Sequence, residues 1–268
     1  VAEDPEGAWA DALAQVARRP PDETAEFPDG ERHRIWRVTG DAADALTAAL
    51  RDARLLIADG HHRYETALAL REIARTEGWT GAAPDYVLAY VVSERDPGLE
   101  VQPTHRVLAR SVGAAPAAWL ERAGAWFDVE LRPEAPPAAI LEALGEVGLG
   151  RAAFAAVLRD VPGGALLVLR PDAERELAPP LRSVGVAALH DLFLPRVAGL
   201  DPGAQRAGER IAYTRDAQEA VGRVCAGEAD AAFLLRPPTF AQMREAALAG
   251  ERMPPKTTYF APKVPTGV

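Results

Sequence analysis

The stretch Leu55–Leu68 reads LLIADGHHRYETAL and carries the densest chemistry of the chain. Its first four residues are uniformly apolar, which predicts a strand covered on both faces. Asp59 and Gly60 follow as a tight turn, with Asp59 at the position of an N-cap. The apolar spacing after the turn predicts a helix to about Glu77. The stretch therefore predicts a strand, a turn and a helix that begins with two histidines and an arginine.

The start of this predicted helix suits an anion, because the first N–H groups of a helix lack partners and lie at its positive end. The guanidinium of Arg63 adds a fork of donors. A purely structural role is the alternative: Asp59 would cap the helix, Arg63 would pair with Glu65 or another carboxylate, and one histidine would pack in the core. His61 and Glu65 share a helix face, but two such ligands do not make a zinc site.

Composition excludes several classes of protein. The chain has 268 residues with 48% apolar and 26% charged residues, which is typical of a globular protein. No apolar run approaches the length of a membrane span, so we expect a cytoplasmic protein without membrane contact. A net charge of −9 opposes nucleic-acid binding, and the single Cys225 excludes disulfides within the chain and cysteine-based metal sites. Any anionic partner is therefore expected to be small and held locally.

Strand and helix patterns alternate along the rest of the chain, with a further apolar strand expected at 86–92. This alternation predicts an α/β protein, or an α+β one, in which helices flank mixed sheets. We expect two domains, a motif subdomain at 1–112 and a C-terminal α+β subdomain at 113–268 whose tail returns to the site. The Pro-rich stretch 171–180 is interpreted as a linker.

Lysine is rare and clustered, since Lys256 and Lys263 are the only two lysines of the chain. Lys256 precedes Thr257 and Thr258, and an ammonium with two hydroxyls suits a phosphate or a carboxylate. No Gly-rich loop precedes them, so this is not a P-loop. The alternative is an edge strand with lysine as a guard against aggregation. Lys263 has the weaker case for a functional role.

Three blocks in order resemble the DUF1015 family, whose activity is not established: the Asp59–Leu68 block, Pro103-Thr104-His105-Arg106, and the tail Met253–Lys263. Members of this family are longer at the N-terminus. Because the chain begins Val1-Ala2-Glu3-Asp4 without an initiator Met, we expect that it starts inside a longer protein.

The turn Asp-Gly-His-His-Arg also resembles the phosphate-binding turn of the ParB/sulfiredoxin superfamily, which implies a motif subdomain of that fold. In sulfiredoxin the corresponding turn is Gly-Gly-Cys-His-Arg, so His61 replaces the cysteine, which excludes sulfinic-acid repair. The free-serine kinases keep Asp-Gly-His-His-Arg, which implies a turn that binds nucleotide phosphates and magnesium. That resemblance also implies an upstream glutamate as base, and the sequence leaves open whether this chain contains the segment that would carry it.

Together the residues and the resemblance predict a nucleotide-dependent phosphotransferase that uses ATP or ADP on a small hydroxylated metabolite such as serine. The alternative is a ParB-like binding or regulatory module that nucleotide switches without catalysis. Magnesium is expected at Asp59. The expected catalytic residues are Asp59, His61 and His62. The expected phosphate or nucleotide contacts are Gly60, Arg63, His105, Arg106, Lys256, Thr257 and Thr258.

Overall fold

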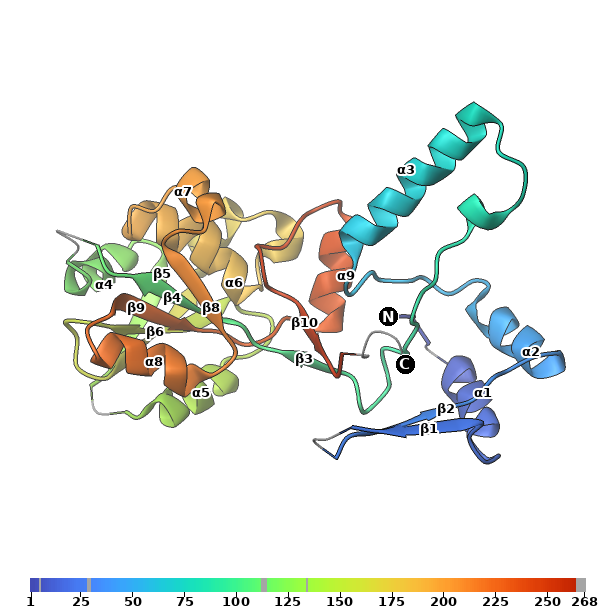
Figure 1. Ribbon diagram of the computed structural model, residues 1–268. Helices are drawn as coiled ribbons and strands as arrows, with labels where there is room; N and C mark the ends of the chain where they lie inside the picture. Colours follow the sequence, from blue (N-terminus) through green and yellow to red (C-terminus); the bar gives the residue numbers. More distant parts are fainter. Residues whose placement is uncertain (5, 28–29, 112–114, 134, 264–268) are drawn as a thin grey trace. The chain divides into compact units, whose positions relative to one another are not determined.

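The computed structural model describes residues 1–4, 6–27, 30–111, 115–133 and 135–263. The chain forms two compact units (Figure 1). The first contains Val1–Glu100 and the described part of Phe260–Val268, and the second contains Val101–Tyr259. The sequence-based boundary at 112/113 lies outside the described residues. In the structure the first unit ends at Glu100, before β4 (His105–Ala109), because β4 pairs with strands of the second unit.

The second unit is built around an antiparallel sheet with strand order β5-β7-β6-β9-β4-β8. Neighbouring strands in the sheet pair in the antiparallel sense throughout. The α/β class predicted from the sequence is confirmed, with the strands of this sheet antiparallel. Its other strands are β5 (Phe127–Arg132), β6 (Ala153–Leu158), β7 (Gly164–Leu169), β8 (Ile211–Thr214) and β9 (Ala229–Leu234).

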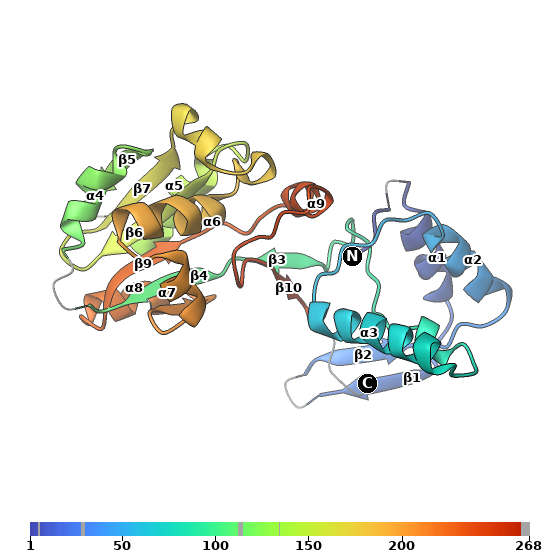
Figure 2. The ribbon, with the colours of Figure 1, turned by 90° about the horizontal axis from the view of Figure 1, so that it is seen from above.

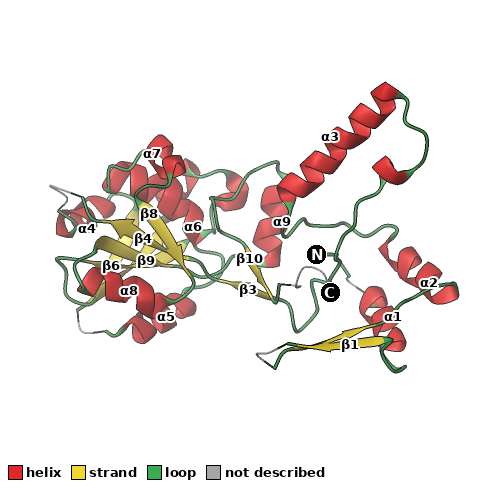
Figure 3. Cartoon of the chain, viewed as in Figure 1, coloured by secondary structure: helices red, strands yellow, loops and turns green. Residues whose placement is uncertain are grey.

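Helices cover both faces of this sheet (Figures 2 and 3). On one face lie α5 (Pro137–Glu146) and α8 (Ala217–Cys225). The other face carries α4 (Ala117–Ala123) and a helical segment made of α6 (Gly185–Ala187) and η4 (Ala188–Val197). The remaining helices of the unit are α7 (Pro202–Ala207) and α9 (Phe240–Leu248). The unit is therefore a helix–sheet–helix sandwich.

The two apolar clusters of the described residues both belong to the second unit, one on each face of its sheet. Strand β6 shows the cause, because Phe154, Ala156 and Leu158 enter one cluster while the residues between them enter the other. Successive side chains of a strand point to opposite faces of the sheet, so a strand covered on both faces contributes alternate residues to each cluster. On one side Phe193 packs edge-to-face against Phe154, with 5.5 Å between ring centroids. This double burial stabilises the second unit.

The stretch 171–180 is not a linker, which corrects the interpretation of its prolines. It forms two 3-10 helices, η2 (Pro171–Glu176) and η3 (Pro179–Leu181). Proline locks φ and removes a donor, which disfavours a longer α-helix. The apolar side chains Ala173 and Leu177 are nevertheless buried in the core. Their burial holds the segment inside the second unit.

The first unit has a small helical part and a hairpin. Helix α1 (Ala8–Val16) packs against α2 (Asp41–Leu50). The strands β1 (Glu23–Glu26) and β2 (Arg32–Ile35) pair only with each other, and α3 (His61–Glu77) leads to η1 (Ala83–Asp85). The short strands β3 (Glu100–Gln102) and β10 (Tyr259–Ala261) pair where the chain passes from one unit to the other.

The apolar stretches 55–58 and 86–92 do not form the two buried strands that their composition predicts. Residues 1–3 lie between 54–56 and 92–94 and join both through backbone hydrogen bonds, but only isolated bridges result. A strand needs a partner along its length, and the described chain supplies one only at these points. Leu55, Tyr86 and Leu88 are consequently exposed.

Candidate functional site

The turn before α3 is built on Gly60, whose φ of +83° lies in the left-handed region. Glycine adopts this conformation without the clash that a Cβ causes. The carbonyl of Gly60 accepts the first helical bond, from the N–H of Tyr64 at 3.0 Å. Gly60 is therefore the N-cap residue, and no side chain caps the helix. The expectation that Asp59 stands at the N-cap is wrong by one residue.

The helix start presents unsatisfied donors. In the described part of the chain, the backbone N–H groups of His61, His62 and Arg63 have no acceptor. They belong to a 17-residue helix, whose dipole places partial positive charge at this end. The first turn of the helix contains no acidic residue. The turn is thus able to accept an anion through its backbone alone.

Two cations meet at the carboxylate of Asp59. Nζ of Lys263 lies 3.4 Å from Oδ2 of Asp59, and a guanidinium nitrogen of Arg63 lies 3.8 Å from the same oxygen. The Arg63 guanidinium also lies against Gly60, where a Cβ would come within 2.9 Å of it. Absence of a side chain at Gly60 therefore lets Arg63 fold back over the turn.

The pKa of Asp59 reflects this surrounding. Partial burial raises the pKa of Asp59, but the Gly60 N–H, Lys263 and Arg63 lower it and outweigh the burial. The net pKa lies below the ordinary value of an aspartate. Asp59 is therefore a carboxylate at neutral pH, and it can accept a hydrogen bond or contribute to a cation site.

The two histidines of the turn are on the surface. The side chain of His62 is fully exposed, and its Nδ1 lies 3.3 Å from Oε2 of Glu65. The side chain of His61 is exposed and has no partner among the residues that the structure describes. Neither imidazole is packed in a core, so the structural role considered from the sequence does not describe them.

The second and third sequence blocks meet inside the second unit. Arg106 on β4 is buried with 2% of its surface exposed. Its Nη2 donates to the carbonyl of Pro255 at 2.8 Å, and Nη1 donates to the carbonyl of Thr104. His105 is also buried, and its Nδ1 accepts the N–H of Leu235 at 3.2 Å. These side chains touch protein atoms, and their contact with phosphate stays a prediction.

The tail of the second unit turns at Lys256, which has a φ of +56°. The ammonium of Lys256 is exposed, and the structure shows no partner for it in the described residues. Thr257 is buried, and its hydroxyl donates to the carbonyl of Pro254. Thr258 is partly buried. A hydroxyl committed to the backbone has less freedom to bind phosphate.

The predicted residues thus form two groups. Asp59, Gly60, His61, His62 and Arg63 belong to the first unit, and Lys263, for which the sequence made the weaker case, lies beside Asp59 there. The second unit holds His105, Arg106, Lys256, Thr257 and Thr258. The rarity of lysine was the signal that could have raised Lys263. Arg215, whose guanidinium lies over the Tyr259 ring, was missed because nothing in the sequence distinguishes it from the other arginines.

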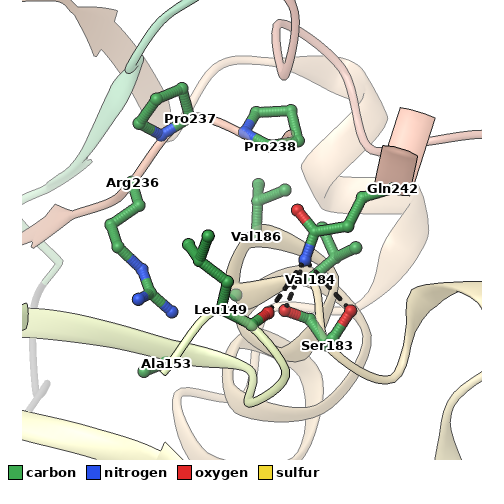
Figure 4. A pocket seen from close by; sticks show the side chains of 10 residues that line it. Leu149, Ala153, Ser183, Val184, Val186, Arg236, Pro237, Pro238 and Gln242 are labelled. Carbon is green, nitrogen blue, oxygen red and sulfur yellow. Dashed lines mark hydrogen bonds between the residues drawn. The ribbon is translucent and has the colours of Figure 1, made fainter. Parts of the chain in front are cut away.

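A pocket in the second unit lies beside Arg236 and Gln242 (Figure 4). Arg236 donates to the carbonyls of Val147 and Arg151, and the Gln242 amide donates to Leu149 and Ser183. Both side chains therefore already donate hydrogen bonds to backbone carbonyls around the pocket. The pocket is therefore better explained as a packing feature than as a ligand site.

Magnesium has one candidate ligand in the first unit. No group of three or more His, Cys, Asp and Glu side chains able to hold a metal occurs among the described residues. Asp59 supplies a single carboxylate. One or two carboxylates with substrate phosphates are a common magnesium environment in proteins. Asp59 supplies one carboxylate of that kind, and the ammonium of Lys263 lies 3.4 Å from it.

The fold and the turn define an α/β protein of two units with a candidate anion site at the start of a helix. The chain belongs to the family described as a protein of unknown function, DUF1015, whose model matches residues 1–186. The resemblance carried by the three sequence blocks is thereby confirmed. No curated protein matches the chain. In the described residues, no helix has both the length and the apolar character needed to cross a membrane.

Solved structures give weak likenesses. A conserved hypothetical protein from Pyrococcus furiosus has a TM-score of 0.40 and 17% identity, over 96% of this chain and 83% of that chain. A free serine kinase in complex with AMP has a TM-score of 0.40 and 16% identity, over 97% of this chain and 82% of that chain. A variant free serine kinase in complex with ADP scores 0.40 at 16% identity, over 97% and 83%. Likenesses of this size carry no argument about function.

Proposed function

We propose that the protein is a nucleotide-dependent phosphotransferase, with ATP or ADP as phosphate donor and a small hydroxylated metabolite such as serine as acceptor. The observation that carries the proposal is the Asp59–Arg63 turn. It combines a left-handed glycine, free backbone donors at the start of a long helix, and an adjacent Arg–Lys pair. Phosphoryl transfer is catalysed mainly by positioning and charge stabilisation, which such groups supply.

In this proposal the free backbone N–H groups of His61, His62 and Arg63 bind a phosphate group. Arg63 contributes charge-assisted hydrogen bonds, because its guanidinium already lies over the turn. The exposed imidazoles of His61 and His62 act on the transferred group or on the acceptor hydroxyl. Asp59 holds the acceptor hydroxyl or magnesium, and Lys263 keeps its carboxylate ionised. Magnesium, when bound, would neutralise charge on the phosphates.

The second-unit residues have a different place in the proposal. Lys256 is exposed and Thr258 partly buried, and within the second unit they are available for a phosphate or a carboxylate. Thr257, His105 and Arg106 are buried and act through the segments that they hold. Their role is to position the 254–258 turn that carries Lys256.

The test uses the full chain with ATP or ADP and serine, and detects phosphoserine by mass spectrometry and nucleotide binding by thermal shift. Arg63→Gln is expected to reduce turnover and nucleotide affinity at least about tenfold, because a charged hydrogen bond is lost. Arg75→Gln, in the last turn of the same helix, changes the net charge equally and should leave both unchanged. Absence of phosphoserine and of any nucleotide-induced shift would overturn the proposal.

A nucleotide-switched binding module without catalysis is the second candidate. The observation that favours it is the engagement of Asp59 by Lys263, because the carboxylate at the turn already has a cation. The net charge of −9 opposes DNA as the partner. Nucleotide binding that depends on Arg63, without phosphoserine from serine and ATP or ADP, would support this candidate over the kinase.

A further inference from the structure

Arg106 is a buried cation without an anion. Its Nε donates to Nε2 of His190 at 3.3 Å, and its Nη atoms donate to the carbonyls of Thr104 and Pro255. The Tyr213 ring lies 5.5 Å from its Cζ. No carboxylate pairs with it in the described structure. Burial lowers the pKa of Arg106 to about 10, so the group stays charged at neutral pH.

The histidines around Arg106 do not add charge. Nε2 of His190 accepts from Arg106, and its Nδ1 lies 2.8 Å from Oε1 of Gln205, which requires the neutral tautomer with the proton on Nδ1. The Leu235 N–H donates to Nδ1 of His105. Burial, and then the charge of Arg106, lower the pKa of both imidazoles to about 4. The positive charge at this place is therefore that of Arg106 alone, and neither imidazole adds to it.

Two exposed cations lie next to this buried one. Arg106 on β4 lies opposite Tyr213 on the neighbouring strand β8, and Arg215 is the first residue after β8. The guanidinium of Arg215 stacks on Tyr259, with Cζ 4.3 Å from the ring centroid. Lys256 follows Pro255, whose carbonyl Arg106 binds. Lys256 and Tyr259 are three residues apart, so their Cα atoms are separated by at most about 10 Å.

Nearby acidic groups are engaged elsewhere. Asp216 caps α8 by accepting the N–H groups of Gln218 and Glu219. Glu219 accepts the hydroxyl of Thr214. Neither Arg215 nor Lys256 has a carboxylate partner among the residues that the structure describes. Arg215 donates to the amide oxygen of Gln102, a neutral group, at 3.4 Å. Two exposed cations that form no ion pair among the described residues thus lie on segments that adjoin Arg106.

We propose that Arg215 and Lys256 form an oxyanion site in the second unit that binds the carboxylate or phosphate group of a small metabolite. Arg106 is a positioning residue, because it holds the 254–257 turn from below and adds positive potential. Tyr259 restrains the Arg215 guanidinium, so less freedom is lost on binding. The site lies in the second unit and does not depend on the anion site proposed at the Asp59–Arg63 turn.

The two lysines make the site directly observable. Reductive ¹³C-methylation of the full chain labels only Lys256, Lys263 and the amine of Val1, and it keeps their charge. Signals are assigned with Lys256→Arg and Lys263→Arg. Inorganic phosphate and acetate are titrated separately at constant ionic strength. A saturable shift of the Lys256 signal with either anion supports the site, and the anion that saturates it identifies the group bound.

Arg215→Gln is expected to weaken this saturation at least about tenfold, because a charged hydrogen bond is removed. Arg122→Gln, an exposed arginine on α4, is the control of equal charge and should leave it unchanged. A Lys256 signal that stays still, drifts without saturation, or weakens equally in both variants would overturn the site. The failure of the proposed function would be seen separately. In that case ATP would not shift the Lys263 signal, while phosphate or acetate would still shift the Lys256 signal to saturation.

Discussion

Nζ of Lys263 lies 3.4 Å from Oδ2 of Asp59, although 204 residues separate them in the sequence. The same oxygen lies 3.8 Å from the Arg63 guanidinium. One carboxylate therefore joins the C-terminal segment of the first unit to the helix start that carries both histidines. This contact gives the second of the two lysines a role that its place near the end of the chain did not suggest.

Loss of the Lys263 ammonium should raise the pKa of Asp59, because Lys263 is one of the groups that lower it. The measurement is a ¹³C carboxyl titration of Lys263→Met by NMR. Lys256→Met, in the second unit, is the matched control and should leave the pKa of Asp59 unchanged. Both members of the pair are about half exposed or more, so the free energy of unfolding should change by less than about 1 kcal/mol. An unchanged pKa would contradict the ion pair.

A side chain at Gly60 should disturb the turn. Gly60→Ala places a Cβ at a φ of +83° and within 2.9 Å of Arg63, so we expect a loss of about 1–2 kcal/mol in the free energy of unfolding of the first unit. Urea denaturation measures it. Gly145→Ala is the control, because Gly145 lies inside α5 with open space around its Cα. That change should be neutral or stabilising by up to about 1 kcal/mol. Equal effects of the two substitutions would contradict the strained turn.

Acid should destabilise the second unit between about pH 6.5 and pH 4. The pKa of His105 and that of His190 are each lowered to about 4 by burial and by Arg106. In this window the two imidazoles are protonated in the unfolded chain and neutral in the folded one. The free energy of unfolding is therefore highest above pH 6.5 and decreases as the pH falls. Each histidine contributes about 2–3 kcal/mol. Urea midpoints measured across the window test this, and His190→Gln should flatten the dependence. A midpoint that does not change with pH would show that the imidazoles are not buried.

Arg106 should affect both the pKa values of its two histidine neighbours and the stability of the turn at Pro255. In Arg106→Leu the nearby charge disappears, so the pKa of His105 and that of His190 should rise. Hydrogen exchange of the 251–259 peptide should accelerate, because the bond to the Pro255 carbonyl is lost. Global stability is a poor readout, since replacing an uncompensated buried charge by an apolar side chain is often neutral or stabilising. Unchanged exchange in 251–259 would contradict the positioning role.

Much of the second unit follows from local patterns. The strand and helix patterns that were expected to alternate along the chain appear, among others, as strand β5 and as the hairpin of β6 and β7. These segments alternate or pair locally, so their structure depends on neighbours close in the sequence. The turn and helix α3 were predicted for the same reason, since glycine and apolar spacing act within a few residues.

Local patterns failed where structure depends on a partner. Residues 55–58 and 86–92 have the composition of buried strands, but a ladder of hydrogen bonds needs a second strand, and they obtain only single bridges to residues 1–3. The Pro-rich stretch 171–180 failed in the opposite sense. Its composition suggested a linker, while Leu177 is buried in the core. Burial is set by the surrounding fold and not by the segment itself.

The sequence alone determined the family and the chemistry available at the Asp59–Arg63 turn, because motif and helix start are local properties. Tertiary structure decided which lysine reaches Asp59 and which arginine is buried. Lys263 meets Asp59 only through the path of the chain, which returns to the first unit after the whole second unit. Within the part of the chain that the structure describes, no carboxylate pairs with Arg106, because its place on an inner strand surrounds it with histidine, tyrosine and backbone carbonyls. Electrostatic partners far apart in sequence are selected by folding, and no local pattern encodes them.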